Sequence, residues 1–483
     1  MIQSVNHFAL LPLYAAAGTA LLVLVLELAV GRWAVPAGIA GGLATIGAAV
    51  TLALDPADTF CGPARCSWVA TPPAAVMAVL FAALTIGVLA LSAPALRLGI
   101  APAGEFCFLL ASSMAGGVVV AYAGDLITLI VGLETLTLPL YVLVGLRRFA
   151  PRERVTTEGA SAAVTFFLVS VVSTALALLG AALLYASTGA LHLAELTGGA
   201  GQFAPLASVG AALLVIGFAF KVAAVPLHAW APATYDGAPI PVAAYLSTAS
   251  KLGGVIALAA VAQRLDTGPL VAVLAVLTMT VGNLVALRQT RMIRLLAWSS
   301  VAQAGYILAP LAAGAAGVPA ALAYAVFFVL LEFVAFGVVV ALRGPGRDGG
   351  DLTEYRATGR HHPWLGAALV LALAGLAGLP PGLAGLFAKV TIVASLIDNG
   401  WGWLAGVVAL NAVIALAYYA RVAASLYAPV GLPSEPVPAA EPGAVATLTR
   451  VDVSRTVGAA VAVATLLTVI LGFAPQWVFD ALS

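Results

Sequence analysis

The chain has 483 residues, of which 63% are hydrophobic and only 8% charged, with a mean hydropathy of +1.09. Roughly a quarter of the residues of a soluble domain are charged, so this composition excludes a soluble protein and indicates an integral membrane protein. The formal net charge of +1 and the lack of a tract rich in Lys and Arg give no reason to expect a nucleic-acid partner.

Continuous apolar runs of about 20 residues, enough for a helix to cross a bilayer, define the predicted elements in chain order. Fourteen runs lie near 10–30, 35–54, 73–93, 106–123, 126–146, 160–186, 206–231, 240–262, 269–288, 292–313, 319–342, 363–397, 402–427 and 455–473. They do not alternate as strands of a barrel would, and a lipid-facing backbone must satisfy its own hydrogen bonds. We therefore predict an all-α polytopic membrane protein with about 14 transmembrane helices.

The arginines between the runs predict the orientation, because inner loops carry an excess of basic residues. If the N-terminus is outside, only Arg65 and Arg264 lie in outer loops. The inner loops then hold Arg32, Arg97, Arg147, Arg148, Arg152, Arg154, Arg288, Arg291, Arg294, Arg343, Arg347, Arg356, Arg360, Arg450 and Arg455. Both termini are therefore expected on the outer face.

The second connection contains Cys61 and Cys66 and is expected outside, where a disulfide persists. Two cysteines in one short loop can reach each other, so we favour a bridge, with two free thiols as the alternative. Cys107 lies alone in a run, where ordinary packing explains it. No Cys or His cluster in the sequence has the spacing of metal ligands.

The three lysines, Lys221, Lys251 and Lys389, all lie inside or at the end of an apolar run, whereas every other residue among the 21 Lys and Arg is arginine. A desolvated lysine ammonium can lose its proton, but a guanidinium in a protein effectively cannot. Keeping lysine only in the membrane therefore indicates that the chain handles protons there.

Helix-breaking residues lie close to these lysines. Pro226 follows Lys221, and Gly378–Gly382 interrupts the long run that contains Lys389. Such breaks recur at the ion sites of transporters, so we predict broken helices 7 and 12. Their spacing of five spans predicts two inverted five-helix repeats. The expected domains are three N-terminal helices (1–100), a first repeat of helices 4–8 (101–265), a second repeat of helices 9–13 (266–430), and an inner loop with helix 14 (431–483).

Glutamates inside the runs need partners, because an intramembrane charge costs about 2.5–3.5 kcal/mol. We predict that Glu134 pairs with Lys221. The pair is either static and orders the bundle, or a switch in which the opposite charge holds the lysine protonated until the two separate. Glu27 and Glu332 are expected to pair with neighbouring subunits or to extend toward the membrane surface.

Other polar residues allow two interpretations each. His228 can pass protons between Lys221 and Lys251, because neutral imidazole both donates and accepts. It equally suits a structural role, bonding a carbonyl freed by the helix break. The tenth run carries polar side chains that either hold a file of water or, for the serines, bond back to their own helix: Ser299, Ser300, Gln303 and Tyr306.

Four stretches make the chain recognisable: GLETLTLPLY at 132–141, FKVAAVPLHAWAPATYDGAPIPVAAYLSTASK at 220–251, LLAWSSVAQAGY at 295–306 and GLPPGLAGLFAKV at 378–390. With them the chain resembles the antiporter-like proton-channel subunits of respiratory complex I. Its YDGAPIPV core resembles the subunit N branch of bacterial NADH:quinone oxidoreductase rather than the two sister branches. The resemblance covers essentially the whole chain, most clearly from the third run onward.

The resemblance implies roles for matching positions. Glu134 is similar to the family's fifth-helix glutamate, Lys221 to its partner on the broken seventh helix, Lys251 to the central lysine, and Lys389 to the lysine of the broken twelfth helix. One position departs from the pattern. Where the family often has a histidine on the tenth helix, this chain has Gln303, which does not titrate near neutral pH. We expect a path from Lys251 to Lys389 to depend more on water as a result.

The implied function is a membrane-arm subunit of NADH:quinone oxidoreductase that translocates protons through a Glu/Lys relay. The sequence has no Cys ligands for iron–sulfur and no GxGxxG between a strand and a helix. NADH, FMN, iron–sulfur clusters and quinone are therefore expected in partner subunits, with no cofactor bound by this chain. The expected partners are other membrane-arm subunits, including sister antiporter-like ones, in the bacterial inner membrane.

Two alternatives stay open. The first is a subunit of a monovalent cation/proton antiporter, which shares this fold and would be favoured by carboxylate-rich ion sites. The second is a non-conducting structural membrane subunit, in which the three intramembrane lysines would have no explanation.

Overall fold

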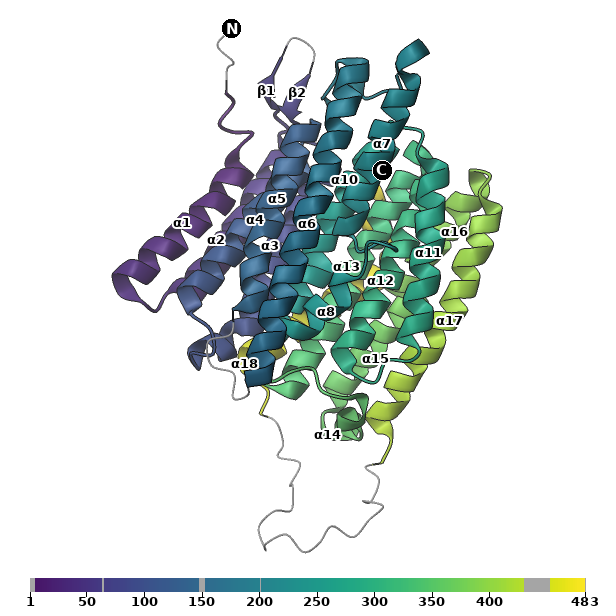
Figure 1. Cartoon of the computed structure of the whole chain (residues 1–483). Helices are drawn as coiled ribbons and strands as arrows, with labels where there is room; N and C mark the ends of the chain where they lie inside the picture. The colour runs from purple at the N-terminus through teal and green to yellow at the C-terminus, as the bar shows by residue number, and fades with distance from the viewer. Residues whose placement is uncertain (1–4, 63–64, 147–152, 200, 430–451, 483) are drawn as a thin grey trace, which may run out of the picture.

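Figure 1 shows the computed structural model of the chain, which describes residues 5–62, 65–146, 153–199, 201–429 and 452–482. Several positions used to predict the orientation lie outside these ranges: Arg147, Arg148, Arg152 and Arg450, together with residues 431–451 of the expected inner loop. The side chain of Arg154 is likewise not described.

Helices make up most of the described chain. Those of the first half are α1 (Leu11–Val30), α2 (Ala34–Leu54), α3 (Pro72–Arg97), α4 (Ala103–Tyr122), α5 (Leu126–Gly145), α6 (Glu153–Thr188), α7 (Ala204–Lys221), α8 (Trp230–Gly237), α9 (Ile240–Tyr245) and α10 (Lys251–Ala262). Those of the second half are α11 (Gly268–Ala286), α12 (Met292–Leu311), α13 (Val318–Arg343), α14 (Thr358–His361), α15 (Pro363–Ala377), α16 (Leu383–Asp398), α17 (Gly402–Tyr427), α18 (Arg455–Phe473) and α19 (Gln476–Leu482).

Short turns and one hairpin complete the architecture. The 3-10 turns are η1 (Leu193–Glu195), η2 (Gly201–Phe203), η4 (Gly314–Gly317) and η5 (Leu352–Tyr355), and η3 (Leu246–Ser250) is a π-helical turn. The strands β1 (Thr59–Cys61) and β2 (Cys66–Trp68) pair antiparallel, with Cys61 opposite Cys66. A disulfide joins these two cysteines, which confirms the predicted bridge.

The membrane-spanning character predicted from the sequence is confirmed. Within the described ranges, 12 helices are long and apolar enough to cross a membrane. The predicted tenth and twelfth spans correspond to α12 and to the interrupted pair α15 and α16, which are not among those 12. The total of fourteen spans and the inverted repeats stay predictions.

The helices form one bundle, with α1 and α2 at one edge and α16 and α17 at the other (Figure 1). In α13, 94% of the residues across the apolar stretch are buried, against 22% in α1. A helix that is hydrophobic on every side can face either lipid or protein, and α13 is enclosed by protein. The hairpin β1–β2 lies at the same end of the bundle as the start of α1 (Figure 1).

Both predicted helix breaks are present. The first separates α7, which ends at Lys221, from α8, which begins at Trp230. The second separates α15 from α16 across Gly378–Gly382. Each break therefore lies beside one of the three lysines, and the third lysine, Lys251, directly follows the π-helical turn η3.

Candidate functional site

An ion pair links α5 to the end of α7. Lys221 Nζ lies 2.6 Å from Glu134 Oε1, and the lysine side chain is 4% exposed against 29% for the glutamate. The ammonium also donates to Thr137 Oγ1 at 3.2 Å and to Ser170 Oγ at 3.0 Å, while Thr174 Oγ1 donates to the same oxygen of Glu134 at 2.5 Å. The predicted pair is thus formed, and neutral hydroxyls surround its buried cation.

The end of α7 positions this lysine. Pro226 cannot supply a backbone donor, and the chain leaves the helix after Lys221. The break leaves backbone groups that need partners, and Val225 N–H donates to Thr278 Oγ1 of α11 at 2.9 Å. Such compensation permits irregular backbone at membrane depth. A cation in the last turn also interacts favourably with the negative end of the helix dipole.

Lys251 lies at the centre of the bundle and is 1% exposed. Its ammonium donates to two atoms of Ser300 on α12, the carbonyl oxygen and Oγ, each at 2.6 Å. The ring centroid of Tyr235 is 6.0 Å away. Among the described residues, Lys221 is the one lysine with a carboxylate within 4.0 Å, so Lys251 has no direct ion-pair partner there. Its π-helical neighbour η3 is of a kind that often occurs at functional sites.

Lys389, on α16, is held by the broken end of α15. Its Nζ donates to the carbonyls of Leu376 and Ala377, both at 2.9 Å, which are the last two of α15. Carbonyls at a helix C-terminus lack intrahelical partners and carry partial negative charge, so they stabilise a cation. The Tyr306 ring centroid lies 4.4 Å from the ammonium. Gly378 has φ +82°, and a Cβ there would lie 2.5 Å from Lys389 Cδ, so glycine is needed at this turn.

A line of buried polar groups approaches Lys389 from the tenth run. Gln303 Nε2 donates to the Leu376 carbonyl at 2.9 Å, the same oxygen that accepts from Lys389, and to the Tyr419 hydroxyl at 3.0 Å. That hydroxyl also hydrogen-bonds to Ser299 Oγ. Ser299 directly precedes the serine that holds the central lysine. The serines of the tenth run therefore bond to groups on other helices, and Tyr419 on α17 is a member that sequence reasoning did not identify.

His228 lies in the segment between α7 and α8. Its ring packs against that of Trp298, with 5.1 Å between centroids, and its Nδ1 is buried without a hydrogen-bond partner among the described residues. No hydrogen bond described joins it to Lys221 or Lys251. A role between the two lysines therefore needs an intervening group, and it stays a prediction.

The prediction for Glu332 is wrong. Its side chain on α13 is 0% exposed, and Oε1 accepts from Ser247 Oγ at 2.6 Å. Because protein encloses α13 on nearly every side, the carboxylate faces the interior and has no route to a neighbouring subunit or to the membrane surface. Glu27, in contrast, is half-buried and lines a cavity of about 830 Å³ with Arg32 and Arg97. Its pairing with another subunit stays a prediction.

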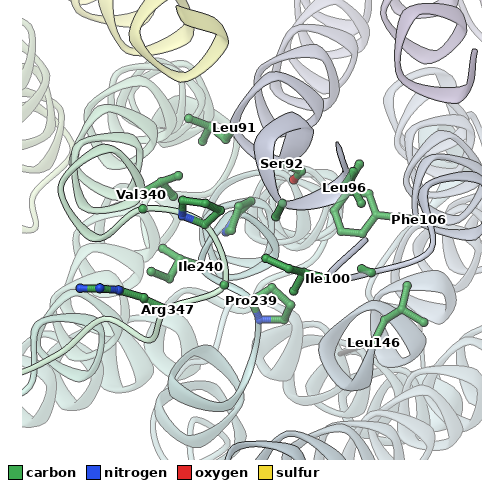
Figure 2. A pocket seen from close by; sticks show the side chains of 16 residues that line it. Leu91, Ser92, Leu96, Ile100, Phe106, Leu146, Pro239, Ile240, Val340 and Arg347 are labelled. Carbon is green, nitrogen blue, oxygen red and sulfur yellow. The ribbon is translucent and has the colours of Figure 1, made fainter. Parts of the chain in front are cut away.

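A separate cavity of about 60 Å³ lies where α3, α9 and the end of α13 meet (Figure 2). Its lining is mostly apolar, with Leu96, Phe106 and Ile240 on the wall and Arg347 at one side. None of the buried lysines or glutamates lines it. The candidate site is therefore the line of polar groups through the bundle and not this cavity.

Broken helices, each with a buried lysine, and a carboxylate partner on α5 define the class of antiporter-like membrane subunits. The sequence matches the family described as NADH:quinone oxidoreductase/Mrp antiporter, transmembrane, over residues 123–415, and the chain belongs to this family. That match includes Glu134 and all three lysines.

Relatives of similar length support the subunit N branch predicted from the sequence. The chain is 56% identical to NADH-quinone oxidoreductase subunit N of Salinispora tropica, over 99% of both chains. It is 40% identical to NADH-quinone oxidoreductase subunit N 2 of Streptomyces griseus, over 99% of this chain and 93% of that one. The predicted resemblance is thereby confirmed.

Solved structures share the fold over nearly the full length. A chain of respiratory complex I from Thermus thermophilus with bound aureothin superposes with a TM-score of 0.81 at 29% identity, covering 98% of this chain and 99% of that one. A chain of the Mrp complex from Dietzia sp. has a TM-score of 0.83 at 21% identity, covering 99% and 96%. The second likeness is one of fold alone.

Proposed function

We propose that this chain is the membrane-arm subunit N of a bacterial NADH:quinone oxidoreductase and translocates protons along Glu134, Lys221, Lys251 and Lys389. The observation that carries the proposal is that all three lysines of the chain are buried, at 4%, 1% and 6% exposure, and held by polar groups rather than left bare. The chain-wide similarity to subunit N proteins supports the same assignment.

The Glu134–Lys221 pair is the input of the proposed relay. Glu134 is partly exposed, so a charge on a neighbouring subunit can attract it, whereas Lys221 is enclosed. Two unit charges about 4 Å apart attract by about 4 kcal/mol at an effective dielectric constant of about 20. Drawing Glu134 away removes an attraction of this size. Lys221 is then left among neutral hydroxyls, and passing its proton toward Lys251 becomes favourable.

The energy scale fits the task. Moving one proton across 100 mV changes its free energy by about 2.3 kcal/mol. An attraction of about 4 kcal/mol, made and broken once per cycle, therefore exceeds that amount. His228 is proposed to assist the step from Lys221 to Lys251 through an intervening water, because it lies in the segment that follows α7, seven residues after Lys221.

Lys389 is the proposed output of the relay. It accepts a proton that leaves Lys251 through the polar line of α12, and the terminal carbonyls of α15 hold its charged form. Gln303 does not titrate, but it is hydrogen-bonded to the carbonyl that also accepts from Lys389. It therefore orients the line without storing a proton.

Redox chemistry is assigned to partner subunits. NADH, FMN, iron–sulfur clusters and quinone are proposed to bind there, and this chain is proposed to act as a translocase subunit with no cofactor of its own. Sister antiporter-like subunits are the proposed neighbours along the membrane arm. The chain is proposed to span the bacterial inner membrane with both termini outward, which the excess of arginine in the predicted inner loops supports.

Proton pumping by the purified complex tests the proposal. The complex is reconstituted in vesicles with and without this chain, and proton uptake is followed on NADH addition, in sodium-containing and sodium-free buffer. The proposal expects NADH-driven uptake that falls without the chain and does not depend on sodium. Sodium-dependent exchange would instead support a cation/proton antiporter, and unchanged uptake in assembled complex lacking the chain would leave it a structural subunit.

A further inference from the structure

A second glutamate lies close to the central lysine. Glu332 lies in the middle of α13 and is 0% exposed. The other charged residue of this helix is Arg343, at its C-terminal end. Its Oε1 accepts from Ser247 Oγ at 2.6 Å, and its Oε2 is buried with no hydrogen-bond partner among the described residues. A carboxylate in such a place is costly unless a positive charge or a proton compensates it.

Two serine hydroxyls connect this glutamate to Lys251. Lys251 Nζ donates to Ser300 Oγ at 2.6 Å, Ser300 Oγ and Ser247 Oγ are 3.0 Å apart, and Ser247 Oγ donates to Glu332 Oε1 at 2.6 Å. Both serines are 0% exposed. Because the hydrogen of Ser247 is directed at the carboxylate, the hydrogen between the two serines must belong to Ser300. Every donor in this series of three hydrogen bonds therefore points from the lysine toward the glutamate.

The backbone favours this arrangement. Ser247 lies on η3 and Lys251 follows it by four residues, so the two side chains lie on the same side of this helical segment. Ser300 faces them from α12 and Glu332 from α13. Three separate helical segments thus contribute side chains to one short series of hydrogen bonds. Neither the packing of apolar helix faces nor contact with lipid requires such an arrangement.

We infer that Glu332 is the proton-exchange partner of Lys251, connected to it through Ser300 and Ser247. The inference rests on the proposed proton-translocating function and extends it with a group outside the line of Glu134 and the lysines. The carboxylate receives a proton when the central lysine gives one up. Return of that proton along the same path restores the charged lysine.

The transfer balances in atoms and charge. The ammonium N–H bond of Lys251 breaks as its proton moves to Ser300 Oγ, the Ser300 proton moves to Ser247 Oγ, and the Ser247 proton moves to Glu332 Oε1. The lysine becomes a neutral amine and the glutamate a neutral carboxylic acid, while each hydroxyl loses one proton and gains one. No electrons are transferred, and the hydrogen bonds end pointing the opposite way.

A static ion pair explains the geometry less well. A stabilising pair brings the two charges into direct contact, as Glu134 and Lys221 do at 2.6 Å. Between Lys251 and Glu332 two hydroxyls intervene, each able to donate and accept. Separation weakens the attraction that would lock both charges in place, and it supplies a path along which one proton can neutralise both.

The test uses the full complex with Glu332→Gln, Glu332→Asp and Ser247→Ala, and Glu195→Gln as the control, because it removes a glutamate charge from an exposed pair outside the chain of serines. Glutamine keeps the size of the side chain and an oxygen for Ser247, so assembly is expected, but it cannot take up the proton. NADH-driven proton uptake per assembled complex is expected to fall by roughly a hundredfold, the lower end for loss of a positioned proton-transfer group. Glu332→Asp is expected to recover part of the lost uptake, and Glu195→Gln is expected to resemble the wild type.

Infrared difference spectra between resting and NADH-driven complex provide a readout that packing alone would not change. A protonated-carboxyl C=O band is expected in the wild type and in Glu195→Gln, and is expected to be absent in Glu332→Gln and reduced in Ser247→Ala. If Glu332→Gln does not assemble, the pumping and the band of Ser247→Ala decide, because that variant keeps the glutamate and interrupts the path.

Outcomes that overturn the inference differ from those that overturn the proposed function. Full pumping by Glu332→Gln or by Ser247→Ala, together with loss of pumping in Lys251→Ala, removes Glu332 from the path and leaves the relay in place. Full pumping by Lys251→Ala as well removes the relay itself.

Discussion

Replacing Glu134 by Gln is the perturbation whose magnitude the structure determines best. The change keeps the shape and an oxygen for Lys221, but removes the negative charge 2.6 Å from its ammonium. Loss of one partner from a buried pair destabilises by about 3–5 kcal/mol. Here the glutamate is 29% exposed and the hydroxyls of Thr137 and Ser170 still accept from the lysine, so we expect the lower end, about 3 kcal/mol. At 1.36 kcal/mol per factor of ten, this corresponds to a rise of roughly a hundredfold in the equilibrium constant for unfolding.

The assay is NADH-driven quinone reduction and proton uptake in vesicles, each normalised to assembled complex. Both are expected to fall strongly in Glu134→Gln, because Lys221 loses the counter-charge on which the switch depends, and less in Glu134→Asp, which keeps the charge. Glu195→Gln is the control, because it removes the same charge from an exposed pair with Arg65 at 3.6 Å, where such pairs contribute about 0–1 kcal/mol. If Glu134→Gln assembles and pumps at the wild-type rate, the switch is refuted and the pair is structural.

Two further predictions concern the orientation and the polar line. A membrane-impermeant thiol reagent applied to intact cells is expected to label Cys61 and Cys66 only after reduction, because the structure joins them in a disulfide and the predicted orientation places their hairpin outside; labelling confined to inverted vesicles would contradict that orientation. Gln303→Leu leaves the Tyr324 hydroxyl, which donates to Gln303 Oε1 at 2.5 Å, without its partner, and is expected to destabilise by about 1–3 kcal/mol and to lower proton uptake. Gln303→His restores polar contacts and is expected to pump at least as well as the wild type. Wild-type pumping by the leucine variant would show that proton transfer to Lys389 does not depend on the polar groups at Gln303.

The spans and the breaks were predictable because the membrane imposes them. A lipid-facing backbone must be helical over about 20 residues, so hydropathy gave boundaries that α11 and α17 match within two residues. Prolines and glycines next to Lys221 and Lys389 indicated where helices stop. The pairing of Glu134 with Lys221 followed from the need of an intramembrane charge for a partner.

The location of Glu332 was not predictable in the same way. A helix such as α13, apolar on every side, gives no periodicity that tells lipid from protein. Its burial depends on neighbours far away in the sequence, including η3 and α12, which contribute Ser247 and Ser300. A signal was nonetheless present, since a glutamate in the middle of a long apolar helix needs a partner. The eighth and tenth apolar runs both contain serines that could supply one.

Tyr419 was missed for a related reason. Sequence reasoning followed the motif stretches, and α17 contains none of them. The hydroxyl joins the polar line only because α17 packs beside α12, where it accepts from Gln303. Hydrogen bonds between helices depend on how the helices rotate about their axes, which hydropathy does not specify.

The most direct test of the central claim is whether Lys389 must release a proton or only carry a charge. Arginine keeps the charge beside the carbonyls of Leu376 and Ala377 but is effectively never deprotonated. Alanine removes both charge and proton, and histidine restores a group that titrates. Proton uptake by reconstituted complex, normalised to assembly, is predicted to be similarly low for Lys389→Arg and Lys389→Ala, and at least as high as either for Lys389→His. Full pumping by Lys389→Arg with failure of Lys389→Ala would contradict the relay and leave this lysine a fixed charge.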